Sequence, residues 1–212
     1  MSKKAILFDL DGTLTDSGEG IINCAILALE HFGLPIPSRE ALGVFIGPPL
    51  DHSFQKFGVP EDRIDEAIAV FRSRYLTKGK FENFPYPGIP EMLEKLQAMG
   101  YDLYVATSKP EETALEIMDH FDLSKYFTCI CGATMDKSRN SKSKVIEYLL
   151  ETCGRGEIIM MVGDTAFDVL GAKAHNIPTI GVSWGYGKVA DMVSAGAVSI
   201  ANTTDELFDL LK

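Results

Sequence analysis

The sequence has little of what a membrane or secreted protein needs. No apolar run approaches the roughly 20 residues that a membrane-spanning helix requires. The apolar run near the N-terminus is broken at once by Asp9 and Asp11, and no small-residue cleavage site of a signal peptide follows it. We therefore expect a cytoplasmic protein without a membrane partner.

Positive charge is also scarce, because 20 Lys and Arg residues stand against 30 Asp and Glu residues, a formal net charge of -10. Such a chain repels nucleic-acid polymers and anionic membranes in general. It also repels a small phosphate, unless a metal ion, lysines or backbone N–H groups reverse the sign of the charge locally. Any anion-binding site must therefore contain its own positive groups.

Cysteine occurs only four times, at Cys24, Cys129, Cys131 and Cys153. One residue separates Cys129 from Cys131, and no second Cys or His pair stands at the spacing of a zinc site. This pattern favours buried free thiols, which fit a reducing intracellular environment.

Internal repeats and low-complexity segments are absent, and short apolar runs alternate with helical stretches instead. Short continuous apolar runs are typical of strands that are buried on both faces. The fold class is therefore α/β, with a Rossmann-like, doubly wound parallel sheet. The predicted strands span residues 5–10, 103–107, 127–131, 158–162, 179–182 and 197–200.

The gap between the first two predicted strands is far longer than a strand-to-helix crossover needs. It contains two helical apolar stripes, which are Ile22, Ala25, Ile26 and Leu29, and then Ile64, Ala67, Ile68 and Phe71. Proline and glycine in residues 84–88 indicate a linker that returns to the sheet. We predict a core domain of residues 1–15 and 85–212, with a small helical domain of residues 16–84 inserted into it.

Aspartates follow two of the predicted strands. Asp9 and Asp11 come after the first strand, and Asp164 and Asp168 come after the fourth. The carboxyl ends of strands in such sheets face the ligand crevice, and like charges this close need a cation or a shared proton. Asp9 and Asp11 could instead form a solvated Asp-Gly turn, and Asp168 could simply cap a helix. Together the four aspartates indicate a site for a hard cation such as Mg²⁺.

Two further segments carry candidate phosphate-binding groups. Thr107 and Ser108 end the second predicted strand just before a helix that is expected to begin at residues 109–110, and helix N-termini bind phosphate oxygens. Lys142 lies near the start of a predicted helix over residues 141–153. A cation there opposes the helix dipole, which favours a functional role over that of a solvated surface lysine. Lys137, Arg139 and Lys144 compete for the same role.

The segment Gly185-Tyr186-Gly187-Lys188-Val189-Ala190 matches a dinucleotide-binding pattern. It follows the fifth strand instead of opening the sheet, and no Walker-type spacing surrounds Lys188. Dehydrogenase and P-loop kinase functions are therefore not favoured.

Taken together, the segment from Asp9 to Thr13, Thr107-Ser108, Lys142 and the pair Asp164 and Asp168 resemble the four motifs of the haloacid dehalogenase superfamily of phosphatases. The helical insertion is similar to the cap domain of that superfamily. Residues 45–50 and 184–187 resemble the phosphoglycolate phosphatase and 5′-nucleotidase-like branch. Two positions depart from the family pattern, since Gly43 and Thr165 stand where relatives often have a basic residue.

The resemblance implies that Asp9 is a nucleophile that forms an aspartyl-phosphate and that Asp11 is the general acid and base. It implies a Mg²⁺ site of Asp9, Asp11, Asp164 and Asp168, in which Asp11 ligates through its carbonyl oxygen. Phosphate oxygens would contact Thr107, Ser108 and Lys142, and Gly47 of the cap would contact the substrate.

The implied partner is a small phosphorylated metabolite, with phosphoglycolate and nucleoside 5′-monophosphates as the favoured substrates, and the chain would be a monomer or a homodimer. Two alternatives stay open. A sugar phosphomutase similar to β-phosphoglucomutase would use the same core, and a non-catalytic interaction protein would retain the fold without the activity.

Overall fold

The computed structural model describes residues 3–48, 50–136, 138–153 and 156–212. Pro49 of the predicted cap motif and Lys137 therefore lie outside the described residues. The chain divides into two compact units, one made of Met1–Thr15 and Pro85–Lys212 and the other of Asp16–Phe84. None of the helices in the described ranges is long and apolar enough to cross a membrane.

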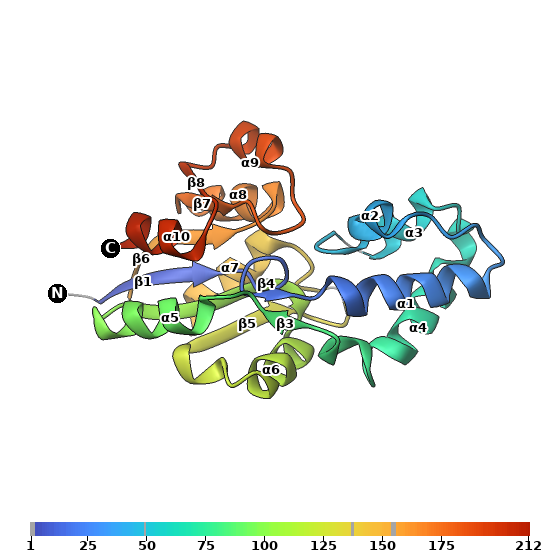
Figure 1. The fold of residues 1–212 in the computed structure, drawn as a ribbon, viewed down its shortest axis with the longest axis horizontal. Coiled ribbons are helices and arrows are strands. Elements are labelled where there is room, and N and C mark those ends of the chain that lie inside the picture. The colour runs from blue at the N-terminus through green and yellow to red at the C-terminus, as the bar shows by residue number, and fades with distance from the viewer. Residues whose placement is uncertain (1–2, 49, 137, 154–155) are drawn as a thin grey trace. The chain divides into compact units, whose positions relative to one another are not determined.

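The larger unit is built on a six-stranded sheet in which every strand pairs parallel to its neighbour (Figure 1). The strands lie in the order β5-β4-β1-β6-β7-β8, so the chain winds outward from β1 in both directions. This confirms the predicted fold class and all six predicted strands. The strands are β1 (Lys4–Phe8), β4 (Asp102–Pro110), β5 (Cys129–Ala133), β6 (Glu157–Gly163), β7 (Thr179–Val182) and β8 (Ser199–Ala201).

Side chains of β1 alternate between two hydrophobic layers, one on each face of the sheet. Ile6 and Phe8 pack in a layer with residues of α5, α6 and α10, while Ala5 and Leu7 pack in a layer with residues of α7 and α8. Burial on both faces explains why the strand is a continuous apolar run. The helices of this unit are α5 (Ile89–Ala98), α6 (Glu111–His120), α7 (Lys142–Thr152), α8 (Ala166–Lys173), α9 (Val189–Ala195), α10 (Thr204–Leu211) and the short 3₁₀ turn Ser124–Tyr126.

The smaller unit is helical, and both predicted apolar stripes face its interior. Of the eight stripe residues, only Ile26 is half-buried, and the other seven are buried. Phe45, Phe54 and Phe71 add an aromatic cluster, with ring centroids 4.9 Å apart for Phe45 and Phe54 and 6.3 Å apart for Phe54 and Phe71. The helices are α1 (Gly18–His31), α2 (Arg39–Leu42), α3 (Leu50–Lys56) and α4 (Ile64–Tyr75), with 3₁₀ turns at Gly43–Phe45, Glu61–Arg63 and Gly79–Phe81. The short strands β2 (Thr15–Asp16) and β3 (Phe84–Pro85) pair with each other.

The predicted start of the helix after Ser108 is wrong. Strand β4 continues to Pro110, which pairs with Ala133 of β5, and α6 begins only at Glu111. The cause is local, because a residue that precedes proline is disfavoured in helical conformation and is held extended. Ser108 is therefore part of the strand, not of a helix N-terminus.

The prediction of four free thiols is also wrong in part. Cys129 of β5 and Cys153, the residue after α7, form a disulfide, while Cys24 and Cys131 are free and buried. The two bonded residues are 24 positions apart in the sequence, and the crossover from β5 through α7 brings their Cα atoms to 6.2 Å. The spacing of the cysteines along the sequence does not show that the chain brings Cys153 back beside Cys129.

Candidate active site

Asp9 is positioned by the central strand of the sheet. It follows β1 directly, its N–H donates to the carbonyl of Val162 in β6 at 2.9 Å, and only 7% of the residue is exposed. Its Oδ1 accepts hydrogen bonds from the N–H of Leu10 and from Lys142 Nζ, each at 2.7 Å. The carboxylate is therefore held at the carboxyl edge of the sheet, where open α/β sheets bind ligands.

Lys142 joins three segments of the site. It is the first residue of α7, which the Ser141 side chain caps, and its Nζ lies 2.7 Å from Asp9 Oδ1, 2.8 Å from Asp168 Oδ1 and 2.8 Å from the carbonyl oxygen of Ala106. An ammonium group has three N–H donors, and these three contacts use all of them. Lys142 is almost fully buried, which separates it from a solvated surface lysine.

The other basic residues near this helix serve different partners. Arg139 donates to the carbonyl of Gly132 and pairs with Glu111, both at 2.7 Å. Lys144 is exposed and donates to the carbonyl of Ser138 at 3.3 Å. Among the described residues, only Lys142 of the candidates reaches the aspartates.

Asp168 caps α8 with one carboxylate oxygen and pairs with Lys142 through the other. Its Oδ2 accepts from the N–H of Thr165 at 3.0 Å and from the Thr165 hydroxyl at 2.7 Å, which completes a capping box at the start of α8. Its Oδ1 faces Lys142. Thr165 thus has a structural task at the position where relatives often have a basic residue.

Asp164 follows β6 and completes a cluster of three carboxylates. Oxygen atoms of Asp9, Asp164 and Asp168 lie within 4.8 Å of one another, and all three residues are buried. Asp164 Oδ2 accepts from the N–H of Tyr186 at 2.8 Å, whereas Oδ1 is buried without a hydrogen-bond partner in the described part of the chain. A buried carboxylate oxygen without a partner has the chemistry of a cation ligand.

The charges of this cluster are not balanced by Lys142 alone. Burial raises the pKa of Asp9 to about 7, although Lys142 opposes the shift. Burial and the neighbouring carboxylate of Asp168 raise the pKa of Asp164 well above its ordinary value. Burial disfavours the charge of Lys142, but Asp168 and Asp9 outweigh that effect and raise its pKa. The raised pKa values favour the protonated forms of the Asp9 and Asp164 carboxyl groups, and a further positive charge would favour the ionised forms.

Asp11 adds to burial in raising the pKa of Asp9, so the two carboxyl groups are electrostatic neighbours, but Asp11 has a different cation partner. The strand ends at Phe8, and the chain turns through Gly12, whose φ is 80°. The Asp11 side chain is not one of the three clustered carboxylates, and its Oδ2 pairs with Lys109 Nζ at 2.7 Å.

Lys109 is a site residue that the sequence analysis missed. Its side chain is buried, with 5% exposed, and it comes from the extended end of β4. The available signal was the position of this lysine, two residues beyond Thr107 and directly before a proline that keeps the chain extended.

The remaining predicted residues divide between the two units. Thr107 is buried in β4, and its Oγ1 accepts from the N–H of Lys109 at 3.2 Å. Ser108 is half-buried beside it. Gly47 lies in the helical unit with a φ of 96°.

Glycines pack directly against the charged residues. A Cβ atom at Gly185 would lie 2.3 Å from the Cβ of Asp164, and one at Gly171 would lie 2.6 Å from the Cβ of Lys142. The Gly-x-Gly pattern after β7 therefore permits close approach to Asp164, and Tyr186 between its glycines donates to that residue.

A family model described as haloacid dehalogenase-like hydrolase matches residues 6–182. A 5′-nucleotidase of Pseudomonas aeruginosa is 44% identical over 184 residues, which cover 86% of this chain and 83% of that protein. The tyrosine-protein kinase PtkA of Mycobacterium tuberculosis is 40% identical over 99% of this chain and 73% of its own length. The crystal structure of a predicted phosphatase from Clostridium acetobutylicum has a TM-score of 0.93 and 39% identity, covering 100% of this chain and 98% of that one.

Proposed function

Because the chain belongs to the haloacid dehalogenase-like hydrolase family and is a phosphatase of that family, we propose that it hydrolyses small phosphomonoesters with the help of Mg²⁺, through an aspartyl-phosphate at Asp9. The observation that carries the proposal is the buried group of Asp9, Asp164 and Asp168 around Lys142. Burying several charged groups together costs desolvation free energy, and such clusters are typical of functional sites.

The donor set fits a hard divalent cation. The three clustered carboxylates of Asp9, Asp164 and Asp168 face one buried ammonium group, that of Lys142, so one divalent cation would balance the excess negative charge. Asp9, Asp164 and the carbonyl oxygen of Asp11 would hold Mg²⁺. Both oxygens of Asp168 are engaged, by Thr165 and by Lys142, which favours contact with the ion through water. When bound, the ion would offset the negative charge of the transferring phosphoryl group.

Asp9 would attack phosphorus with Oδ2, because its contacts in the described structure fall on Oδ1. A bond forms between Oδ2 and phosphorus as the bond from phosphorus to the ester oxygen breaks. Asp11 gives its proton to that leaving oxygen, and its carboxylate then takes a proton from the water that attacks the aspartyl-phosphate. Inorganic phosphate leaves, and both aspartates return to their first state.

The other predicted residues would bind and orient the phosphoryl group. Thr107, the N–H of Ser108 and Lys142 would contact its oxygens, and Gly47 of the helical unit would contact the rest of the substrate. Lys109 would hold the Asp11 carboxyl group in position. Phosphoglycolate and nucleoside 5′-monophosphates are the substrates that we favour, the latter supported by the similarity to the Pseudomonas 5′-nucleotidase.

The similarity to PtkA supports a second candidate function, phosphoryl transfer to a tyrosine hydroxyl. The same aspartate would accept a phosphoryl group from a nucleoside triphosphate and pass it to the phenol oxygen instead of to water. This function and the hydrolase function share the aspartyl-phosphate, but they differ in the donor, a nucleoside triphosphate instead of a phosphomonoester, and in the acceptor, a phenol instead of water.

The test is phosphate release from a panel of phosphoglycolate, nucleoside 5′-monophosphates, sugar phosphates and an aryl phosphate, with Mg²⁺ or with EDTA. We expect release only with Mg²⁺, and a loss of more than about 1,000-fold in Asp9→Asn. The exposed Lys144→Ala on the same helix as Lys142 is the matched control and should retain activity. Phosphate release by Asp9→Asn at the wild-type rate would refute the proposal. Transfer of label from γ-labelled ATP to a tyrosine peptide, without phosphate release from any ester, would favour the second function.

A further inference from the structure

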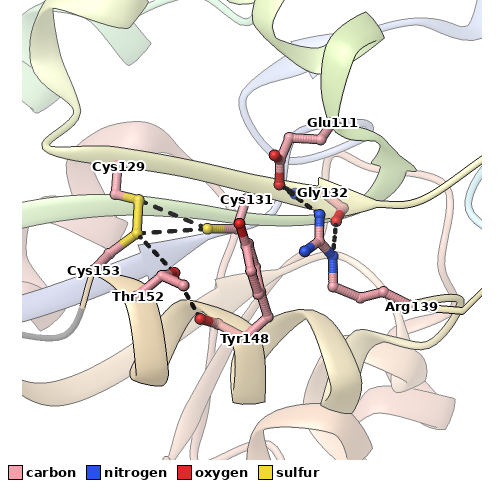
Figure 2. The surroundings of a disulfide bond; sticks show 8 residues. All are labelled: Glu111, Cys129, Cys131, Gly132, Arg139, Tyr148, Thr152 and Cys153. Carbon is pink, nitrogen blue, oxygen red and sulfur yellow. Dashed lines mark hydrogen bonds and ion pairs between the residues drawn. A yellow bond between two sulfur atoms is a disulfide. The ribbon is translucent and has the colours of Figure 1, made fainter.

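The disulfide of the larger unit is one edge of a cluster of three sulfur atoms (Figure 2). Cys131 Sγ lies 3.7 Å from Cys129 Sγ and 3.7 Å from Cys153 Sγ. Cys129 and Cys131 are two positions apart on β5, so both side chains point to the same face of the strand, toward the residue that follows α7. The three ligand atoms lie within 4.8 Å of one another.

These distances match the geometry of a thiolate metal site. A zinc–thiolate bond is about 2.3 Å long, so two thiolates on neighbouring corners of a tetrahedron lie about 3.8 Å apart. Two edges of the sulfur triangle already have this length. The third edge is closed by the disulfide, and its reduction returns those two sulfurs to non-bonded distance.

We propose that, once the Cys129–Cys153 disulfide is reduced, Cys129, Cys131 and Cys153 bind one thiophilic cation of the Zn²⁺ type through three thiolates. Metal binding and the disulfide are then mutually exclusive states of the same residues. A dithiol reductant supplies the two electrons and two protons that open the S–S bond and itself becomes a disulfide. The cation then displaces the three thiol protons.

The surroundings of the cluster suit such an ion. Three thiolates and a divalent cation leave only one negative charge, and the nearby Arg139 and Glu111 form an ion pair, as Figure 2 shows, so their two charges offset each other. Thr152 Oγ1 lies 3.4 Å from Cys153 Sγ and can hydrogen-bond to it. Cys129 and Cys153 are only half-buried, which leaves access for a water molecule as fourth ligand. The site is separate from the carboxylate cluster, whose oxygen ligands suit Mg²⁺ instead.

The test uses the full chain, reduced with a dithiol and freed of reductant without air, and titrated with Cd²⁺ as a spectroscopic probe. The ultraviolet thiolate-to-cadmium charge-transfer band reports only sulfur ligands, so Cd²⁺ on the aspartates does not contribute to it. We expect one equivalent of Cd²⁺ to saturate the band, Zn²⁺ to displace it, and the oxidised protein to give none.

Single cysteine variants distinguish the proposed metal ligands from a cysteine that lies outside the site. Cys131→Ser and Cys153→Ser should each weaken Cd²⁺ binding by more than about 100-fold, since even the loss of an outer partner costs roughly 10–100-fold. Cys24→Ser, which removes the remaining free thiol in the other unit, should leave binding unchanged. Circular dichroism of each reduced protein checks the fold.

Three results would overturn the proposal. They are the absence of the band in a folded, reduced protein, a band that survives in Cys131→Ser at full affinity, and unfolding of the wild type on reduction alone. None of these outcomes bears on phosphate release, so this proposal and the proposed enzymatic function fail independently.

Discussion

Replacing Lys142 by methionine removes one ammonium group and keeps most of the apolar length of the side chain. In the native structure that group lies 2.7 Å from Asp9 and 2.8 Å from Asp168, and a further contact reaches the carbonyl of Ala106. The variant leaves two buried carboxyl groups without their cation. We expect Lys142→Met to be destabilised by about 3–5 kcal/mol at pH 8 without added metal, the usual range for breaking a buried ion pair on one side.

The loss should depend on pH in a direction that follows from linkage. The pKa of Asp9 is already raised to about 7 by burial, with Lys142 opposing, and removing the lysine raises it further. A carboxyl group whose folded pKa exceeds its unfolded value binds more protons in the folded state, so stability falls as the pH rises from the unfolded pKa of about 4 through the folded one. At pH 5 Asp9 can bind a proton in the variant, which removes its uncompensated charge. Because each pKa unit is worth about 1.4 kcal/mol, the deficit should shrink by about 1–2 kcal/mol between pH 8 and pH 5.

The assay is urea unfolding at pH 5, 6.5 and 8 for the wild type, Lys142→Met and the matched variant Lys144→Met. Lys144 lies on the same helix but is exposed, and its replacement should cost less than about 0.5 kcal/mol at every pH. A deficit for Lys142→Met below about 1 kcal/mol at pH 8, or one that grows on acidification, would refute the assignment of Lys142 as the buried counter-ion.

Three further predictions concern neighbouring groups. Asp164→Asn should raise the free energy of unfolding at pH 7.5 by about 1–2 kcal/mol in EDTA, because it removes a carboxyl group whose pKa burial has raised. The same substitution should abolish stabilisation by Mg²⁺. Thermal melts with and without Mg²⁺ measure both effects. Gly171→Ala should cost about 1–3 kcal/mol and reduce phosphate release, since its Cβ would lie 2.6 Å from Lys142 Cβ, whereas Gly43→Ala meets open space and should be neutral in the same assays. Burial raises the pKa of the Cys131 thiol to about 11, and Glu111 adds to the shift. Its alkylation, followed by mass spectrometry, should therefore accelerate about 100-fold from pH 8 to pH 10, where a thiol with an unshifted pKa gains only about tenfold.

The sequence predicted the sheet well because burial on both faces leaves a direct mark on a strand. Each predicted strand overlaps an observed one, and residues 179–182 match β7 residue for residue. Asp9 and Asp164 could be found in the same way, because carboxylates directly after such strands must meet at one edge of a parallel sheet.

Side-chain contacts between segments that are distant in the sequence could not be predicted from a comparable sequence pattern. The pairing of Asp11 with Lys109 depends on a turn at Gly12 and on the extended path before Pro110, two local features that become related only in the folded sheet. The disulfide depends on where α7 ends relative to β5, which spacing along the chain does not encode. For Asp168 the sequence left a choice between a helix cap and a metal ligand. The structure shows the cap on one oxygen and Lys142 on the other, and the role of metal ligand stays a prediction.

All three N–H donors of Lys142 are used within the protein, and this helps to explain how an acidic protein can bind a phosphate. Its three donors are already committed to Asp9, Asp168 and the Ala106 carbonyl, so Lys142 cannot contact a phosphate oxygen without leaving one of them. Leaving Asp9 would uncover a buried carboxylate unless another cation takes over that oxygen. The lysine is therefore available to an anion only when a second positive charge stabilises Asp9, which makes binding of the cation and of the phosphate mutually supportive. On this reasoning the net charge of -10 is no obstacle to binding a phosphate, because the site becomes attractive to an anion only after it has bound its cation.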